Sequence, residues 1–256
     1  MINLYNKYAS EGFNPINGIY SDFDCRMIYS IVREYKPKKI IDFAPREGRT
    51  TSCILSGLLL NIKENNDKIY YYVFEKDIQF LNKTKEHVNN YINENNLDDK
   101  FNVVFNENII DSPILEEIND IDLLFIDANH DYILAKWYVD NLFNKVSNKG
   151  IIHIHDIYFN EYGNGWEDIT MINHHKNHNA PPHPDYSNIQ TMKNLYSAIF
   201  DKYYEGEEII NQFEGDVIKK FYAENENKFD FYSTLEMSKK MNLYHNFNCS
   251  LYLKKK

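Results

Sequence analysis

The chain has 256 residues, 43% of them apolar, which is enough for one large domain with a sizeable core. Its formal net charge of −10 disfavours a nucleic-acid partner, because the phosphate backbone is itself anionic. The three cysteines are dispersed, the N-terminus shows no secretory signal, and no apolar run approaches the length of a membrane span. We therefore expect a cytoplasmic protein, without a membrane or nucleic-acid partner, that acts on a small molecule.

Helical and strand patterns alternate along the first 157 residues. Residues 1–20 resemble an irregular arm, and helical apolar spacing behind Ser21 predicts a helix over 21–35. Short, nearly continuous apolar runs predict strands over 39–43, 69–74, 102–105, 121–126 and 150–154. Helices are predicted between them, over 49–61, 78–95, 113–118 and 132–146. Such strands are typical of a parallel sheet covered by helices on both faces, so we expect an α/β fold.

The pattern changes after residue 157. Residues 158–188 contain two glycines, three prolines and four histidines without periodicity, which predicts a long loop over one edge of the sheet. Helices are predicted over 189–204, 207–222 and 229–243, and a strand over 247–253. We expect one domain, in which 1–160 form the arm and most of the core, 161–188 a lid loop, and 189–256 the remaining elements.

Acidic or histidine residues stand at the carboxyl ends of the predicted strands. In parallel sheets the ligand crevice lies outside these ends. The end residues are Asp42, Glu75, Asn106 with Glu107, Asp127, and His155 with Asp156. The sequence therefore predicts one binding edge that carries several acids.

The segment KIIDFAPREGRTT, residues 39–51, predicts a ligand-binding corner. Its strand stops at Asp42, a turn follows, and a helix begins near Thr50 and Thr51. A helix N-terminus offers free N–H groups to a carboxylate or phosphate. Only Gly48 among the turn residues is glycine, so the segment lacks the glycine triplet of dinucleotide-binding turns.

These motifs resemble the class I S-adenosylmethionine-dependent methyltransferases, in particular the small-molecule and sugar O-methyltransferases. The likeness covers about residues 35–160 and is greatest in FIDANHDY (125–132) and KGIIHIHDIY (149–158). Ala44 stands where that family has its first turn glycine, and Ala128 replaces a glycine of the later motif. The resemblance implies a Rossmann-like, seven-stranded, mostly parallel sheet with helices on both faces and a cap. It also implies methylation of a hydroxyl group, with a sugar or nucleotide-linked sugar of surface-glycan biosynthesis as the expected acceptor.

The resemblance also assigns cofactor contacts by position. Asp42, Ala44 and Gly48, with Thr50 and Thr51 at the helix start, would hold the methionine moiety of S-adenosylmethionine. Glu75 would bind the ribose, and Glu107 and Asn108 would lie beside the adenine. Asp127 would lie where the methyl group meets the acceptor.

Two catalytic designs fit the later motifs. In the first, Asp127 and Asp156, with or without His155, bind a Mg²⁺-like ion that grips the acceptor. In the second, His130 or His155 acts as a metal-free general base. We expect His153, which lies within a strand, to be an ordinary buried residue.

Other interpretations stay open at this stage. The histidines of the loop (His174, His175, His178 and His183) suit a zinc site, a substrate-binding lid or a solvated loop. The altered turn at 44–47 also suits a binding module that has lost catalysis, and a nicotinamide-dependent oxidoreductase is a weaker alternative. In similar enzymes the N-terminal arm often closes a neighbouring subunit's site, so a homodimer is a further expectation.

Overall fold

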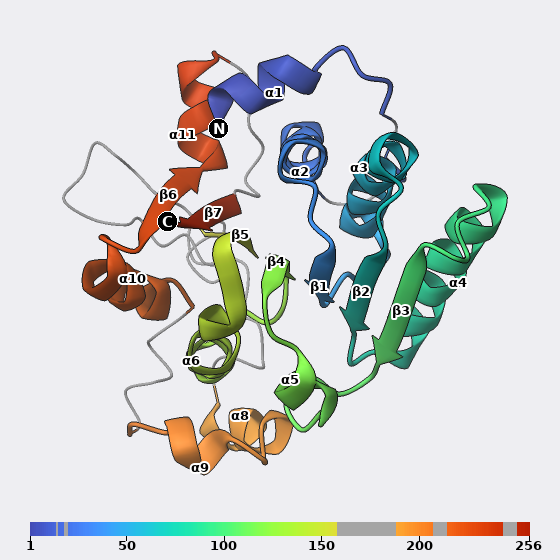
Figure 1. Ribbon diagram of the computed structural model, residues 1–256. Coiled ribbons are helices and arrows are strands. Elements are labelled where there is room, and N and C mark those ends of the chain that lie inside the picture. Colours follow the sequence, from blue (N-terminus) through green and yellow to red (C-terminus); the bar gives the residue numbers. More distant parts are fainter. Residues whose placement is uncertain (14, 18–19, 158–187, 207–213, 243–249) are drawn as a thin grey trace.

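The computed structural model describes residues 1–13, 15–17, 20–157, 188–206, 214–242 and 250–256. A seven-stranded sheet of order β3-β2-β1-β4-β5-β7-β6 forms its centre (Figure 1). Strands β1 to β5 are parallel to one another, and β7 is antiparallel to both β5 and β6. The strands are Lys39–Phe43 (β1), Ile69–Phe74 (β2), Phe101–Asn106 (β3), Ile121–Ile126 (β4), Val146–His155 (β5), Phe229–Ser233 (β6) and Ser250–Lys255 (β7). The predicted α/β class and the Rossmann-like, seven-stranded, mostly parallel sheet are confirmed.

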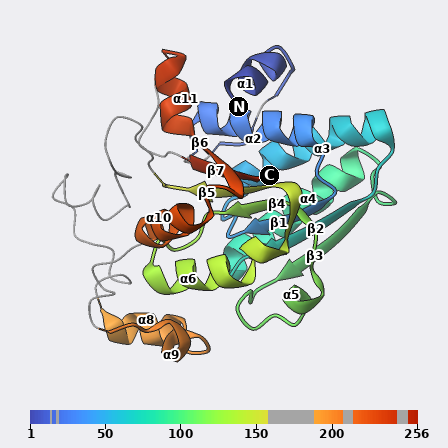
Figure 2. The same ribbon diagram turned by 60° about the vertical axis from the view of Figure 1, so that its left-hand side comes forward.

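Helices cover both faces of the sheet (Figure 2). One core lies between the sheet and α2 (Asp22–Tyr35), α3 (Arg49–Asn65), α4 (Ile78–Glu94) and α11 (Thr234–Lys240). The other lies against α5 (Ile114–Glu117), α6 (Tyr132–Asn141), α8 (Ile189–Leu195), α9 (Phe200–Tyr203) and α10 (Glu214–Asn225). Neighbouring strand residues such as Ile40 and Ile41 enter opposite cores, which explains the continuous apolar runs. Among the described residues, no helix combines the length and apolar character that crossing a membrane requires.

Some sequence predictions were wrong in detail, including the helix expected over 132–146, which ends at Asn141, while β5 already begins at Val146. The arm is not wholly irregular, because α1 forms over Ile2–Tyr8. The helix expected over 189–204 is broken into α8 and α9, and Tyr196 turns inward to donate a hydrogen bond to Asp131. The helix expected over 229–243 begins as β6, because the Phe and Tyr residues of this segment favour a strand, Phe229 is buried and the segment pairs with β7. The predicted segments 207–213 and 247–249 lie outside the described residues.

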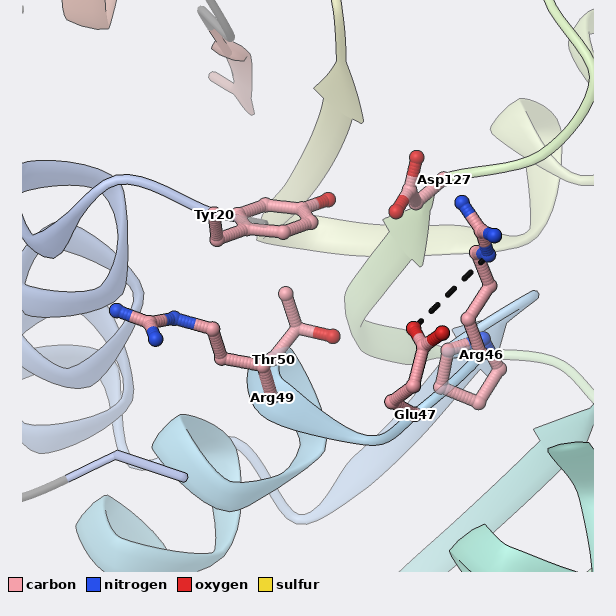
Figure 3. A pocket seen from close by; sticks show the side chains of 7 residues that line it. Tyr20, Arg46, Glu47, Arg49, Thr50 and Asp127 are labelled. Atoms are coloured by element: carbon pink, nitrogen blue, oxygen red, sulfur yellow. Dashed lines mark ion pairs between the residues drawn. The ribbon is translucent and has the colours of Figure 1, made fainter. Parts of the chain in front are cut away.

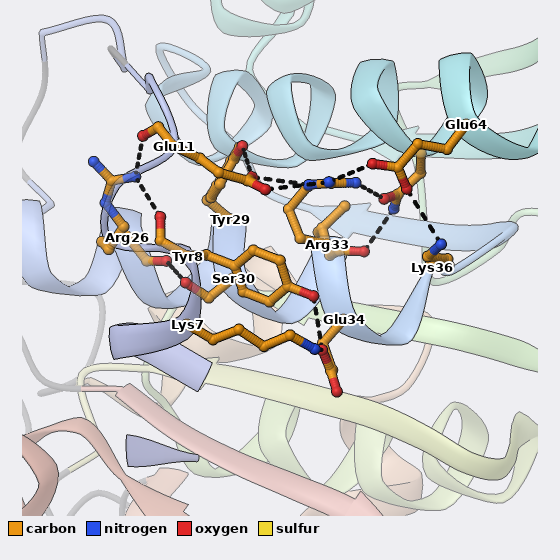
Figure 4. A network of polar contacts seen from close by, with 12 residues as sticks. Lys7, Tyr8, Glu11, Arg26, Tyr29, Ser30, Arg33, Glu34, Lys36 and Glu64 are labelled. Atoms are coloured by element: carbon orange, nitrogen blue, oxygen red, sulfur yellow. Dashed lines mark hydrogen bonds and ion pairs between the residues drawn. The ribbon is translucent and has the colours of Figure 1, made fainter. Parts of the chain in front are cut away.

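The N-terminal arm is held on α2 by a network of polar contacts (Figure 4). Arg33 of α2, only 7% exposed, donates to Glu11 of the arm at 2.9 Å and to Glu64 of α3 at 2.6 Å. Tyr8 of α1 donates to Glu34 of α2 at 2.7 Å. Because a guanidinium buried to this degree needs carboxylate partners, Arg33 fixes the arm to the body of its own chain.

Candidate active site

The corner after β1 has the geometry of an anion-binding turn. Ala44 and Arg46 have left-handed backbone conformations (φ 63° and 48°), and Gly48 has φ 83°. The amide of Ala44 donates to the carbonyl of Phe74 at 2.7 Å, which joins the turn to the end of β2. Gly48 is the N-cap of α3, and no side chain caps this helix start. The first N–H groups of α3 are thus available to a ligand carboxylate.

Asp42 is a fully buried carboxyl group at the end of β1. Its Oδ2 accepts hydrogen bonds from Thr51 Oγ1 at 2.7 Å and from the Tyr71 hydroxyl at 2.6 Å. Its Oδ1 has no hydrogen-bond partner among the described residues. Burial raises the pKa of Asp42 to about 6, although the two hydrogen bonds oppose the shift. One buried oxygen is therefore left to accept a proton donor from a ligand.

Glu75, at the end of β2, is oriented by the backbone. One carboxylate oxygen accepts from the amide of Arg46 at 3.1 Å and the other from the amide of Asp77 at 3.0 Å. The residue is 6% exposed, and burial raises the pKa of its carboxyl group. Each oxygen keeps a second lone pair, so the carboxylate is able to accept two further hydrogen bonds.

Asp127 follows β4 and forms an ion pair with His155 at the end of β5. The amide of Asp127 donates to the carbonyl of Phe43 at 3.1 Å, so β1 and β4 end side by side. His155 Nδ1 lies 3.1 Å from Asp127 Oδ1 and 3.5 Å from Asp156 Oδ1. Burial alone would lower the pKa of His155, but Asp156 and Asp127 outweigh it and raise the pKa to about 9. Likewise burial would raise the pKa of Asp127, yet the imidazolium of His155 lowers it.

A small pocket opens beside this ion pair (Figure 3). Figure 3 shows the Tyr20 hydroxyl pointing toward the carboxylate of Asp127. Tyr20 is 4% exposed, and its ring stacks on His155 with centroids 3.8 Å apart. The pocket is lined by Tyr20, Pro45, Arg46, Glu47, Arg49, Thr50 and Asp127. It thus joins the start of α3 to Asp127, under a ring supplied by the N-terminal arm.

His130 lies behind this pocket, between two carboxylates. Its Nε2 is 3.4 Å from Asp156 Oδ2, and its Nδ1 is 2.6 Å from Glu214 Oε2. Burial disfavours the charged ring, but Glu214 and Asp156 raise its pKa well above the usual value. Sequence reasoning missed Glu214 and Tyr20. Glu214 lies 84 residues from His130 without a motif, and the position of Tyr20 just before Ser21, the cap of α2, does not show that its ring covers the site.

The structure brings together most of the predicted site residues but not all of them. Glu107 and Asn108 are exposed beyond the end of β3, two strands from β1, where Asn108 Oδ1 accepts from the amide of Ile110 at 3.1 Å. His153 is fully buried, as expected, and stacks on Phe125 with ring centroids 4.1 Å apart, but neither of its ring nitrogens has a hydrogen-bond partner among the described residues. The histidine loop, with His174, His175, His178 and His183, lies outside the described residues.

The residues proposed for Mg²⁺ do not fit a divalent ion in this arrangement. His155 Nδ1 lies between carboxylate oxygens of Asp127 and Asp156, where a metal ion would need those same oxygens. In the described parts of the chain, no three His, Cys, Asp or Glu side chains are grouped so as to hold an ion. A cationic imidazole thus takes the position between the carboxylates.

Comparisons with known proteins agree with this architecture. A family model described as a methyltransferase domain matches residues 23–157. Similar solved structures include an O-methyltransferase from Bacillus cereus in complex with SAH (12% identity, TM-score 0.51), covering 99% of this chain and 89% of that one. A SAH-bound methyltransferase from Podospora anserina (13%, TM-score 0.50) covers 99% and 94%. The O-methyltransferase TomG from Streptomyces achromogenes, in complex with SAM, covers 100% and 87% (10%, TM-score 0.50). A search of curated protein sequences gives no match.

Proposed function

This chain belongs to the family of methyltransferase domains, and we propose that it transfers a methyl group from S-adenosylmethionine to a hydroxyl group of a small molecule. The observation that carries the proposal is the position of Asp127. Its carboxylate lines a pocket that also contains the uncapped start of α3, and His155 holds it from behind. Methyl transfer to oxygen needs this combination of a cofactor site and a nearby proton acceptor.

The strand-end residues suit S-adenosylmethionine, which supplies an electrophilic methyl group on a sulfonium when it is bound. The N–H groups at Arg49, Thr50 and Thr51 would receive the methionine carboxylate. Asp42 Oδ1, which lacks a partner among the described residues, would accept from the methionine ammonium group, and Glu75 from the ribose hydroxyls. Ala44 and Gly48 would let the cofactor approach the backbone, and Glu107 with Asn108 would border the adenine. The similar solved structures that contain SAM or SAH support S-adenosylmethionine as the cofactor.

Asp127 is the group we propose to take the proton of the acceptor hydroxyl. His155 keeps the Asp127 carboxylate ionised, because it lowers the pKa of that group. A carboxylate is basic enough for this step, since an oxygen that carries both its proton and a new methyl group is a strong acid. His155 therefore acts through Asp127. His130, whose two ring nitrogens both face carboxylates, is better placed to hold Asp156 than to reach the acceptor.

The acceptor class and the metal requirement are part of the proposal. We retain a sugar or nucleotide-linked sugar as the acceptor, on the family resemblance and on the polar side chains around the pocket. We propose catalysis without Mg²⁺, because His155 lies between Asp127 and Asp156. The proposal of methyl transfer to a hydroxyl group depends neither on a sugar acceptor nor on the absence of Mg²⁺.

Ligand-binding and turnover measurements on the same protein test the proposal. Thermal-shift titration should show stabilisation by S-adenosylmethionine and S-adenosylhomocysteine but not by NAD, about 2.7 kcal/mol at a hundredfold excess over Kd. Transfer of a labelled methyl group to a panel of hydroxyl acceptors then reports turnover. Asp127→Asn should remove turnover and keep cofactor binding, whereas the exposed Asp98→Asn should change neither.

The outcomes separate the rival functions. Cofactor binding without transfer to any acceptor would favour a binding module that has lost catalysis. Stabilisation by NAD alone would favour an oxidoreductase. Full activity in Asp127→Asn would show that another group accepts the proton.

A further inference from the structure

Glu214, the first residue of α10, places a buried carboxylate behind the candidate site. It is 1% exposed, and both of its oxygens have side-chain partners. Oε2 lies 2.6 Å from His130 Nδ1, and Oε1 accepts from the Tyr138 hydroxyl at 2.7 Å. The amide of Glu214 also donates to the carbonyl of His130 at 3.3 Å. Side chain and backbone of one residue therefore both contact His130.

A carboxylate buried to this degree is unfavourable unless a cation compensates it. The compensating group is the imidazolium of His130, and the geometry leaves its ring little freedom. With Nδ1 held by Glu214, the opposite nitrogen Nε2 must face Asp156, at 3.4 Å. The contact is thus directional and does more than neutralise charge.

The contacts continue from His130 to the pocket wall. Asp156 presents one oxygen to His130 and the other, at 3.5 Å, to His155. His155 in turn lies 3.1 Å from Asp127, which lines the pocket. A series of alternating carboxylates and imidazoles thus connects α10 with the proposed proton acceptor.

We propose that Glu214 is a positioning residue of the methyl-transfer site: it orients His130, and through His130, Asp156 and His155 it fixes the carboxylate of Asp127. This inference rests on the proposed function and extends it to a residue outside the segment that the family model matches. The competing explanation is that Glu214 only attaches α10 to α6, which also pack together through apolar side chains. A positioning role predicts that loss of the Glu214 charge lowers kcat, whereas a purely structural role predicts lower stability at unchanged kcat.

The test compares Glu214→Gln with Glu224→Gln, which makes the same chemical change at an exposed position of α10. Glutamine at position 214 keeps the size of the side chain but loses its charge. We expect kcat to fall about 10- to 100-fold, as for a misplaced catalytic group, while KM and Kd for S-adenosylmethionine stay within about twofold. Nitrogen-15 resonances of the His130 ring should shift in Glu214→Gln and keep their wild-type values in Glu224→Gln.

A second variant protects the test against a failure of Glu214→Gln to fold. Tyr138→Phe removes only the hydroxyl that holds Glu214 Oε1, and we expect a smaller fall of kcat, again at unchanged Kd. Wild-type kcat in both variants, or in whichever of them folds, would overturn the proposal, even if their thermal stability decreased. Unchanged His130 resonances in Glu214→Gln would overturn it as well. A wild-type protein that neither binds the cofactor nor transfers methyl would instead contradict the proposed function itself.

Discussion

Replacing Asp42 by asparagine is expected to stabilise the folded chain at neutral pH while it weakens cofactor binding. The folded-state pKa of Asp42 is about 6, compared with an ordinary value of 3.8. The folded chain therefore holds this proton more tightly than the unfolded chain does. As a result, the stability of the wild type decreases as pH rises from about 4 to about 6 and the decrease persists above that range. Asparagine has no proton to lose, and its amide is able to accept the same two hydrogen bonds.

The size of the effect follows from the two pKa values. Relative to its value at low pH, this pKa shift lowers the free energy of unfolding of the wild type by about 3 kcal/mol at pH 8 and by roughly 1.6 kcal/mol at pH 5. The stability of Asp42→Asn relative to the wild type should therefore increase by about 1.4 kcal/mol between pH 5 and pH 8. Taking this difference cancels any constant effect of the substitution, including altered hydrogen bonds to Thr51 and Tyr71.

Urea unfolding followed by circular dichroism, at several values of pH between 5 and 8, measures this difference. The exposed Asp98→Asn serves as the control and should run parallel to the wild type. A relative stability that stays constant with pH would refute the reasoning that burial controls Asp42. Calorimetry with S-adenosylhomocysteine should show weaker binding for Asp42→Asn, because an amide N–H replaces one acceptor oxygen.

Two further experiments address the cofactor and the metal. Glu75→Ala should remove most of the affinity for S-adenosylhomocysteine, since two oriented hydrogen-bond acceptors are lost. The control variant Glu86→Ala, on the exposed side of α4, should bind the ligand as the wild type does. Equal affinities of the two variants would show that Glu75 does not contact the ribose. Treatment with a chelator should leave the rate of methyl transfer unchanged, and a loss of activity that added Mg²⁺ restores would show that a metal displaces His155 from Asp127 and Asp156.

The parallel half of the fold could be predicted from the sequence because its signals are local. Strands β1, β2 and β4 have the predicted bounds, since each is a short apolar run between polar residues that stop it. The sequence predicts β7 as a strand, over 247–253, but predicts a helix where β6 forms. The sequence of β6, FDFYS, is rich in Phe and Tyr, which favour strands, and the segment pairs with β7, so the predicted helix misread a short strand in front of α11. A local sequence pattern thus predicts an element correctly when the tertiary contacts of that element favour the same structure.

The site residues that could be predicted are likewise those with a local sequence signal. Asp42, Glu75, Asp127 and His155 were found because each stands where an apolar run ends, and parallel strands bring those ends to one edge. Glu214 was not found, because its contact with His130 depends on how α10 packs against α6. Tyr20 was missed for a related reason: the sequence places it before a helix but does not show that the arm returns over the site.

The charges of this cluster explain why a site without a metal suits methyl transfer from a sulfonium. Asp127, Asp156 and Glu214 supply three carboxylates, and His130 and His155 supply two imidazolium groups, which leaves one formal negative charge. During methyl transfer to a hydroxyl, positive charge leaves the sulfur and develops on the acceptor oxygen. A net negative cluster that reaches the pocket at Asp127 stabilises that charge where it forms. A divalent ion in place of the His155 imidazolium would bring the formal charge of the cluster to zero, whereas the two imidazoliums order the carboxylates and leave one negative charge.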